Sequence, residues 1–143
     1  MWFFEGKEFK GDIADETIGF VYQITKIDDG RKYIGKKLFR FSRTKQVKGK
    51  KKRFKIASDW KTYYGSNKKL LADVELFGSE FFRRDILHLC KSKGVCSYLE
   101  TKEIILQDAL LSNEYYNEWI TAKISRSHLK DLTNETKTKK RKI

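Results

Sequence analysis

The sequence predicts a small α/β (α+β) domain in which helices flank an antiparallel sheet. Segments rich in Val, Ile, Phe, Tyr and Thr, which are typical of strands, alternate with segments of helical periodicity. The connection between the first two strands is too short for a parallel crossover, so we expect them to be antiparallel. With 39% hydrophobic residues, the chain has enough apolar material to fold as one domain, which we place at residues 1–132.

The first two predicted strands form a hairpin. They span residues 18–26 and 32–39, and the Asp29-Gly30 pair between them is a turn signal. If this pair forms a two-residue type I′ turn, Tyr22 faces Lys37. Even positions of the first strand then share a face with odd positions of the second. The shared face would carry Tyr22, Ile24, Tyr33, Gly35 and Lys37.

A basic stretch, residues 40–55, follows the hairpin and has no strong helical period, so we expect a loop or an extended, frayed ribbon. It belongs to a longer block, residues 31–55, with 13 basic residues and no acidic one. The whole chain has 32 basic and 19 acidic residues, so this block supplies all of the formal net charge of +13. Such a block is typical of a surface that binds a polyanion. Nucleic acid is the polyanion we expect, because the block lacks the amphipathic helical pattern that binds anionic membranes.

Two helices and one more strand are predicted after the basic stretch. The first helix begins near Ser66, a good N-cap, and ends at Gly78. Residues 81–90 form the third strand. The second helix opens at Ser97 and runs to about residue 111, and a shorter helical pattern carrying Tyr116, Trp119 and Ile120 follows it. The polar and basic residues 133–143 are expected to be a disordered tail.

Composition excludes several classes of protein. No apolar run approaches the ~20 residues of a membrane span, and the N-terminus lacks the apolar segment of a secretory signal. The 2 cysteines cannot make a disulfide-rich scaffold. We therefore expect a cytoplasmic protein with no membrane partner.

Two short motifs of the predicted hairpin resemble a known family. Phe20-Val21-Tyr22 and Tyr33-Ile34-Gly35 are similar to the paired motifs of the GIY-YIG nuclease superfamily. The first motif has Phe and Val where the family has Gly and Ile, but it keeps the tyrosine. Further segments resemble a phage-encoded, Seg-like branch, so the resemblance covers about residues 18–120. These segments are residues 59–66, 81–87, 98–100 and 115–117.

The resemblance implies a three-stranded antiparallel sheet flanked by helices and a metal-dependent hydrolase of phosphodiester bonds. We therefore expect a DNA endonuclease that uses one Mg²⁺ or Mn²⁺ ion on double-stranded DNA, in the host cytoplasm if a phage encodes it. Matched motif by motif, Glu100 is the metal ligand and Gly35 lets the backbone pass close to the site. The expected catalytic arginine is Arg43, with Arg40 as the alternative. The other expected catalytic residues are Tyr22, Tyr33 and Asn117.

These residue types suit the expected chemistry. Mg²⁺ keeps most of its waters, so one carboxylate can hold it, and an arginine presents a planar pair of donors to phosphate. A tyrosine can act as general base only if its pKa is lowered, and Lys36, Lys37 and the metal would act in that direction. Otherwise the phenols only orient the water. We favour Tyr33 as the base, with Tyr22 as the alternative.

Glu100 also has a structural interpretation. Ser97-Tyr98-Leu99-Glu100 has the pattern of a capping box, in which the carboxylate reaches back to the backbone amide of Ser97. The helix is apolar around most of its circumference, which favours an inward-facing Glu100. Glu103 is the alternative metal ligand.

Basic residues of the block are the expected DNA contacts, and phosphate contacts of this kind predict low to moderate sequence specificity. The same charge suits a nucleic-acid-binding protein without catalysis, which is the alternative function. A single active site would need a partner subunit, such as a second copy in a homodimer, or a second visit to cut both strands. The expected contact residues are Lys36, Lys37, Lys48, Lys50, Lys51, Lys52, Arg53 and Lys55.

Overall fold

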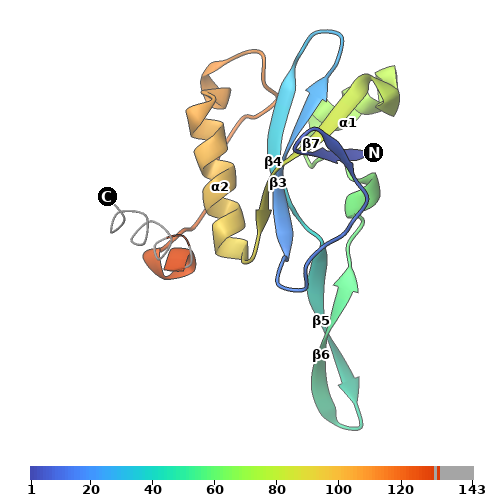
Figure 1. The fold of residues 1–143 in the computed structure, drawn as a ribbon, viewed down its shortest axis with the longest axis vertical. Coiled ribbons are helices and arrows are strands. Elements are labelled where there is room, and N and C mark those ends of the chain that lie inside the picture. The colour runs from blue at the N-terminus through green and yellow to red at the C-terminus, as the bar shows by residue number, and fades with distance from the viewer. Residues whose placement is uncertain (131, 133–143) are drawn as a thin grey trace.

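The computed structural model describes residues 1–130 and 132, and its centre is a five-stranded sheet with strand order β2-β1-β7-β3-β4 (Figure 1). Strand β1 is parallel to β7, and the other neighbouring pairs are antiparallel. The mixed α+β class is therefore confirmed. The strands of this sheet are β1 (Trp2–Phe4), β2 (Lys7–Phe9), β3 (Gly19–Lys26), β4 (Lys32–Leu38) and β7 (Phe82–Cys90).

The predicted count of three strands is wrong. Strands β3, β4 and β7 are those three, and the first residues of the chain add β1 and β2 as a short hairpin. Trp2 holds this hairpin to the sheet, because its ring is 2% exposed and its Nε1 donates a hydrogen bond to the Trp60 carbonyl at 2.8 Å. Strands of three residues carry too weak a pattern to be recognised before packing is known.

The β3–β4 hairpin confirms that the two tyrosines share a face, but its register differs from the prediction by two residues. Tyr22 pairs with Gly35, because the loop has four residues, closed by a hydrogen bond from the Lys26 amide to the Arg31 carbonyl at 2.8 Å. Side chains alternate along a strand with a period of two, so a shift of two residues leaves every side chain on its predicted face.

The basic stretch forms a second hairpin that extends away from the sheet (Figure 1). It consists of β5 (Arg40–Val47) and β6 (Lys50–Ala57). Of the two predicted alternatives, the extended ribbon is the one observed. Its two-residue turn is Lys48-Gly49, with φ of 50° and 75°, the positive values that a type I′ turn requires. We call this hairpin the basic arm.

Both helices begin at residues other than those predicted. Helix α1 (Lys68–Phe77) is capped by Asn67, whose side chain accepts from the Leu70 amide at 2.9 Å, so Ser66 is not the N-cap. Helix α2 (Lys93–Leu106) is capped by Ser92, which accepts from the Val95 amide at 3.1 Å. The predicted start at Ser97 is therefore wrong, because an equally good capping serine lies one turn earlier.

After α2 the described part of the chain is mostly irregular. The predicted helical pattern around residues 115–120 is wrong, because Tyr115 forms a bridge to Lys32 of β4 and the Tyr116 amide donates to the Lys32 carbonyl at 2.7 Å. The predicted tail lies outside the described residues. No helix within the described part of the chain has the length and apolar character to cross a membrane. Single-turn 3₁₀ helices occur at Trp60–Thr62, Ser79–Phe81, Ala109–Leu111 and Arg126–Leu129.

Two apolar clusters hold the helices on opposite faces of the sheet. Phe20, Tyr22 and Ile24 of β3 belong to the cluster that contains Leu70 of α1. The intervening residue of β3, Val21, belongs to the cluster that contains Ile104 of α2. The sheet separates these two faces over most of its area. Because β4 is the edge strand, side chains from both faces can meet at its outer edge.

Candidate active site

A cavity of about 210 Å³ lies at the outer edge of β4. It brings together four of the predicted catalytic residues, which come from four different segments of the chain: β3, β4, α2 and the irregular segment that follows it. The side chains that line it are Tyr22, Tyr33, Ile34, Lys36, Ser66, Glu100, Ile104, Asn117, Trp119 and Thr121.

Glycines make room for the two phenols. Tyr22 lies opposite Gly35 across the hairpin, and a Cβ atom at Gly35 would overlap the Tyr22 ring. Gly65, just before α1, has φ of 92°, and a Cβ there would approach Tyr33 and Leu70 to 3.2 and 3.1 Å. Only residues without side chains leave this space beside the strand.

The two tyrosines are unequally accessible. Their ring centroids are 6.2 Å apart, but Tyr22 is 1% exposed whereas Tyr33 is half-buried, with its hydroxyl 3.4 Å from the Ser66 hydroxyl. Burial is the main cause that raises the pKa of Tyr22, and nearby Tyr63 and Tyr33 act in the same direction. Burial also raises the pKa of Tyr33, against the hydrogen bond from Ser66. Both pKa values are therefore raised rather than lowered, and neither lysine is among the causes of the shifts.

Glu100 points from α2 toward the phenols. Its half-buried carboxylate has no hydrogen-bond partner among residues 1–130 and 132, and burial raises its pKa, with Lys36 acting in the opposite direction. The capping box with Ser97 is not formed, because both residues lie inside α2; the Ser97 hydroxyl instead accepts from Lys36 Nζ at 2.6 Å. Glu103, the alternative ligand, contacts His88 at 2.8 Å and does not line the cavity.

The cavity suits a hydrated divalent cation held by one carboxylate. Within residues 1–130 and 132, no group of three or more His, Cys, Asp and Glu side chains could enclose a metal ion. Mg²⁺, however, usually retains several waters and binds proteins through one or two carboxylates. Glu100 offers one carboxylate without a hydrogen-bond partner, and the cavity has room for bound waters.

Asn117 closes one end of the cavity by pairing with the backbone of β4. Its Oδ1 accepts from the Ile34 amide at 3.0 Å, and its Nδ2 donates to the Ile34 carbonyl at 2.8 Å. Neighbouring Tyr116 is buried, and its hydroxyl donates to Asp73 at 2.6 Å. Both polar atoms of the Asn117 amide are thus occupied, which fits a positioning role better than direct chemistry.

Among residues 1–130 and 132, Lys36 is the cation that lines the cavity, whereas neither predicted arginine lines it. Arg40 lies at the base of the basic arm beside Ser42 and Lys55, and the Arg43 guanidinium lies 4.8 Å from the centre of the Phe41 ring.

Lys37 lies on the opposite face of β4 from Lys36. Its Nζ contacts the Asp59 carboxylate at 2.7 Å and the Tyr63 ring at 4.0 Å.

Several residues that line the cavity, Lys36, Ser66 and Trp119 among them, are not predicted as site residues from the sequence. The sequence indicates Lys36 as a DNA contact and as a charge near the tyrosines, Ser66 as a helix cap and Trp119 as part of a helix, but none of them as a member of the site. Lys36 lies on β4, and Ser66 and Trp119 lie on segments beside it, an arrangement that becomes visible only once the strand pairing is known. For Ser66 the preceding Gly65 was the available signal, because glycine is common where the backbone approaches a site closely, and its φ in the structure is positive.

Comparison with known proteins identifies one family. A family model described as "Putative endonuclease segE, GIY-YIG domain" matches residues 2–120. Neither the curated proteins nor the solved structures gave a significant match to the chain. The matched range includes every element from β1 to the segment that carries Asn117 and Trp119.

Proposed function

The chain belongs to the SegE-type GIY-YIG endonuclease family, and on that basis we propose that it is a metal-dependent DNA endonuclease with its active site at the outer edge of β4. One observation carries the proposal. Tyr22, Tyr33 and Glu100 come from three different elements and line one cavity together with Lys36. A protein that only bound DNA through charge would have no need of this convergence.

Phosphodiester hydrolysis defines what the residues must do. The water oxygen forms a bond to phosphorus, the bond from phosphorus to the departing sugar oxygen breaks, and a proton passes from the water to the departing oxygen. The protein must orient the water, stabilise negative charge that develops on the phosphate, and hold the backbone of the DNA in place.

We assign the contact with the attacking water to Tyr33. Its hydroxyl is accessible from the cavity and is held by Ser66 at 3.4 Å. Because its pKa is raised, the phenol is neutral near pH 7 and orients the water through a hydrogen bond rather than acting as a phenolate. Tyr22 is buried behind it and positions the Tyr33 ring.

The charged groups of the cavity would stabilise the phosphate. Glu100 would hold the single Mg²⁺ or Mn²⁺ ion, which when bound supplies positive charge at the scissile phosphate. The Lys36 ammonium adds a second positive charge and donates hydrogen bonds to phosphate oxygens from the same cavity. The basic arm, with the predicted contact residues Lys48, Lys50, Lys51, Lys52, Arg53 and Lys55, would hold the DNA outside the cavity.

Cleavage of supercoiled plasmid tests the proposal. We expect nicked or linear product with Mg²⁺ and none with EDTA. Glu100→Gln should slow cleavage by about 10²- to 10³-fold, the range typical for loss of one electrostatic contributor in an active site. Glu103→Gln is the matched control on the same helix, because it removes the same charge at a carboxylate that contacts His88 outside the cavity.

Two outcomes would contradict the proposal. Cleavage that persists in EDTA would exclude the metal-dependent mechanism. Binding of plasmid without nicking in Mg²⁺ or Mn²⁺ would instead support a nucleic-acid-binding protein without catalysis, which the charge of the basic arm would equally suit.

A further inference from the structure

A second cavity adjoins the proposed active site. It has a volume of about 350 Å³, within the range of small-molecule sites. The two cavities share four lining residues, which are Tyr33, Ser66, Asn117 and Trp119. A polymer whose phosphate lies in the first cavity would therefore place its next unit in the second.

Trp119 is more exposed to solvent than is usual for a tryptophan. Its side chain is 70% exposed, whereas the other two tryptophans of the chain, Trp2 and Trp60, are 2% and 6% exposed. The exposure does not come from a loose backbone, because Asn117 is held by two hydrogen bonds to Ile34 and Ile120 packs against an apolar cluster. A fixed, solvent-facing indole at the rim of a cavity is a suitable platform for an aromatic ligand.

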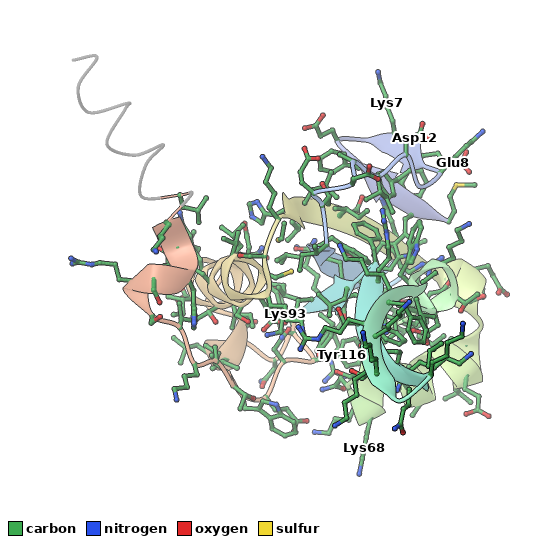
Figure 2. The ribbon with its side chains drawn as sticks, turned by 90° about the horizontal axis from the view of Figure 1, so that it is seen from below. Lys7, Glu8, Asp12, Lys68, Lys93 and Tyr116 are labelled. Carbon is green, nitrogen blue, oxygen red and sulfur yellow. The ribbon has the colours of Figure 1, made fainter. Side chains whose placement is uncertain are left out.

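Two lysines of α1 complete the second cavity. Lys68 extends into solvent at the end of the molecule opposite to Lys7 (Figure 2). Lys69 forms an ion pair with Glu118 at 2.9 Å, but its side chain is 68% exposed, so the pair is weak and a phosphate can replace the carboxylate. An aromatic platform beside exchangeable cations matches the two parts of a nucleotide, its base and its phosphate.

We propose that this second cavity is a nucleotide subsite, in which Trp119 stacks on the base next to the scissile phosphate and Lys68 and Lys69 bind the neighbouring phosphate. The proposal rests on the proposed function in that the ligand is DNA and the first cavity holds the scissile phosphate, but binding of the base in the second cavity can be measured without cleavage. The base must leave its stack to reach the indole, so the subsite would favour single-stranded, frayed or distorted DNA at that position.

The fluorescence of Trp119 gives a direct test. Because the other two tryptophans are buried, acrylamide should quench mainly Trp119 in the free protein. The probe is an eight-nucleotide single strand, compared with the same sequence as a blunt duplex, both in EDTA so that no cleavage occurs. We expect the single strand to quench the emission saturably and to protect the remaining emission from acrylamide, with a smaller effect from the duplex.

Variants separate stacking from other contacts. Trp119→Leu should lower single-turnover cleavage, and single-strand affinity in EDTA, by about 5- to 150-fold, the range measured for loss of one base–aromatic stack. Trp119→Phe should retain most of both, because it keeps an aromatic face. Lys68→Ala with Lys69→Ala should weaken single-strand binding more than Lys7→Ala with Lys10→Ala, which removes the same charge from β2 and from the residue just after it.

The outcomes distinguish this proposal from the proposed function. If Trp119→Leu leaves single-strand binding unchanged and DNA does not quench the emission, the subsite is wrong even where plasmid cleavage is normal. A protein that cuts no DNA would contradict the nuclease. If DNA still quenches its emission, and if Trp119→Leu weakens single-strand binding while Trp119→Phe retains it, the subsite would be supported. A change of emission that depends on protein concentration without DNA would identify Trp119 as a protein contact and overturn the subsite.

Discussion

At the scale of single residues, the site depends on side chains that are absent as much as on those that are present. Gly35 leaves the space that the Tyr22 ring occupies, and Gly65 leaves the space beside Tyr33. Because both phenols are packed against backbone on one side, their hydroxyls have few alternative positions. This packing is the physical basis for orienting a water molecule without a charged base.

Gly35→Ala tests this packing. The added methyl group would displace the Tyr22 ring, and a displacement of about 1 Å in an active site can cost about 10²-fold in rate. We expect single-turnover cleavage to fall by about 10²-fold, while overpacking lowers the free energy of unfolding by about 1–3 kcal/mol. Rapid-quench cleavage and denaturant unfolding measure the two effects.

Gly6→Ala is the matched control for that experiment. Gly6 has φ of 80° in the β1–β2 turn, and a Cβ atom there meets no other atom within 4 Å. The variant should lose about 1–2 kcal/mol through backbone strain alone and cleave at the normal rate. Equal loss of rate in both variants would show that instability, rather than displacement of Tyr22, causes the effect.

The pH dependence of metal binding is a second prediction at this scale. Burial raises the pKa of Glu100 above its ordinary value of 4.5, and a proton competes with the metal for the carboxylate. Mg²⁺ affinity should therefore be nearly constant at high pH and fall as pH drops through a midpoint above 4.5. Lys36→Met should move that midpoint upward, because the ammonium lowers the Glu100 pKa. Calorimetric titration at several pH values measures it, and a midpoint at or below 4.5 would contradict the buried environment of Glu100.

At the scale of elements, the basic arm has two chemically different faces. Cross-strand partners share a face, and the pairs Ser42–Lys55, Thr44–Arg53 and Gln46–Lys51 place hydrogen-bonding and basic side chains together. The opposite face carries Phe41, Ile56 and Phe54 among its basic residues. A two-stranded ribbon fits the major groove of DNA, where polar side chains can reach base edges and phosphates.

Two triple variants of equal charge test which face binds DNA. Each phosphate contact contributes about 0.9 to the slope of log affinity against log salt concentration. We expect Lys51→Ala with Arg53→Ala and Lys55→Ala to lower the slope by up to about 3, and the same change at Arg43, Lys45 and Lys52 to lower it less. Fluorescence anisotropy of a labelled duplex in EDTA measures the slope. Equal effects of the two triple variants would mean that the arm binds DNA through its total charge and not through one face.

At the scale of the whole molecule, the basic arm and the proposed active site are different parts of the structure. The basic arm projects from one end of the sheet (Figure 1), while the cavity at the edge of β4 is lined by residues of β3, β4 and α2, by Ser66 and by the segment 117–121. Residues outside the block 31–55 carry equal numbers of basic and acidic side chains. Affinity for DNA should therefore be dominated by the arm, and catalysis by the cavity.

Salt dependence of the intact protein tests this division. If six or more phosphates are contacted, affinity should fall by about 10³-fold or more between 50 and 200 mM salt. The rate of single-turnover cleavage with all DNA bound should change far less, because Glu100 and Lys36 are half-buried and salt screens such charges less than exposed ones. If the affinity for DNA hardly changes with salt concentration, the basic block is not the main DNA contact.

The sequence by itself determined the charge block, the helix-and-strand composition and the shared face of Tyr22 and Tyr33. The last of these followed from side-chain alternation, which a loop of two or of four residues satisfies equally well. Motif resemblance supplied Glu100 and Asn117, whose residue types alone allowed a capping box or a surface role.

Only the tertiary structure decided which residues meet at the cavity. The N-terminal strands join the sheet through a hydrogen bond between Trp2 and Trp60, which are remote in sequence. Helix α2 begins after Ser92 rather than Ser97, and the sequence offers both as caps. Lys36, Ser66 and Trp119 are brought together by contacts between residues remote in sequence. Local pattern carries no information about such contacts, because they are selected by the packing of the whole chain.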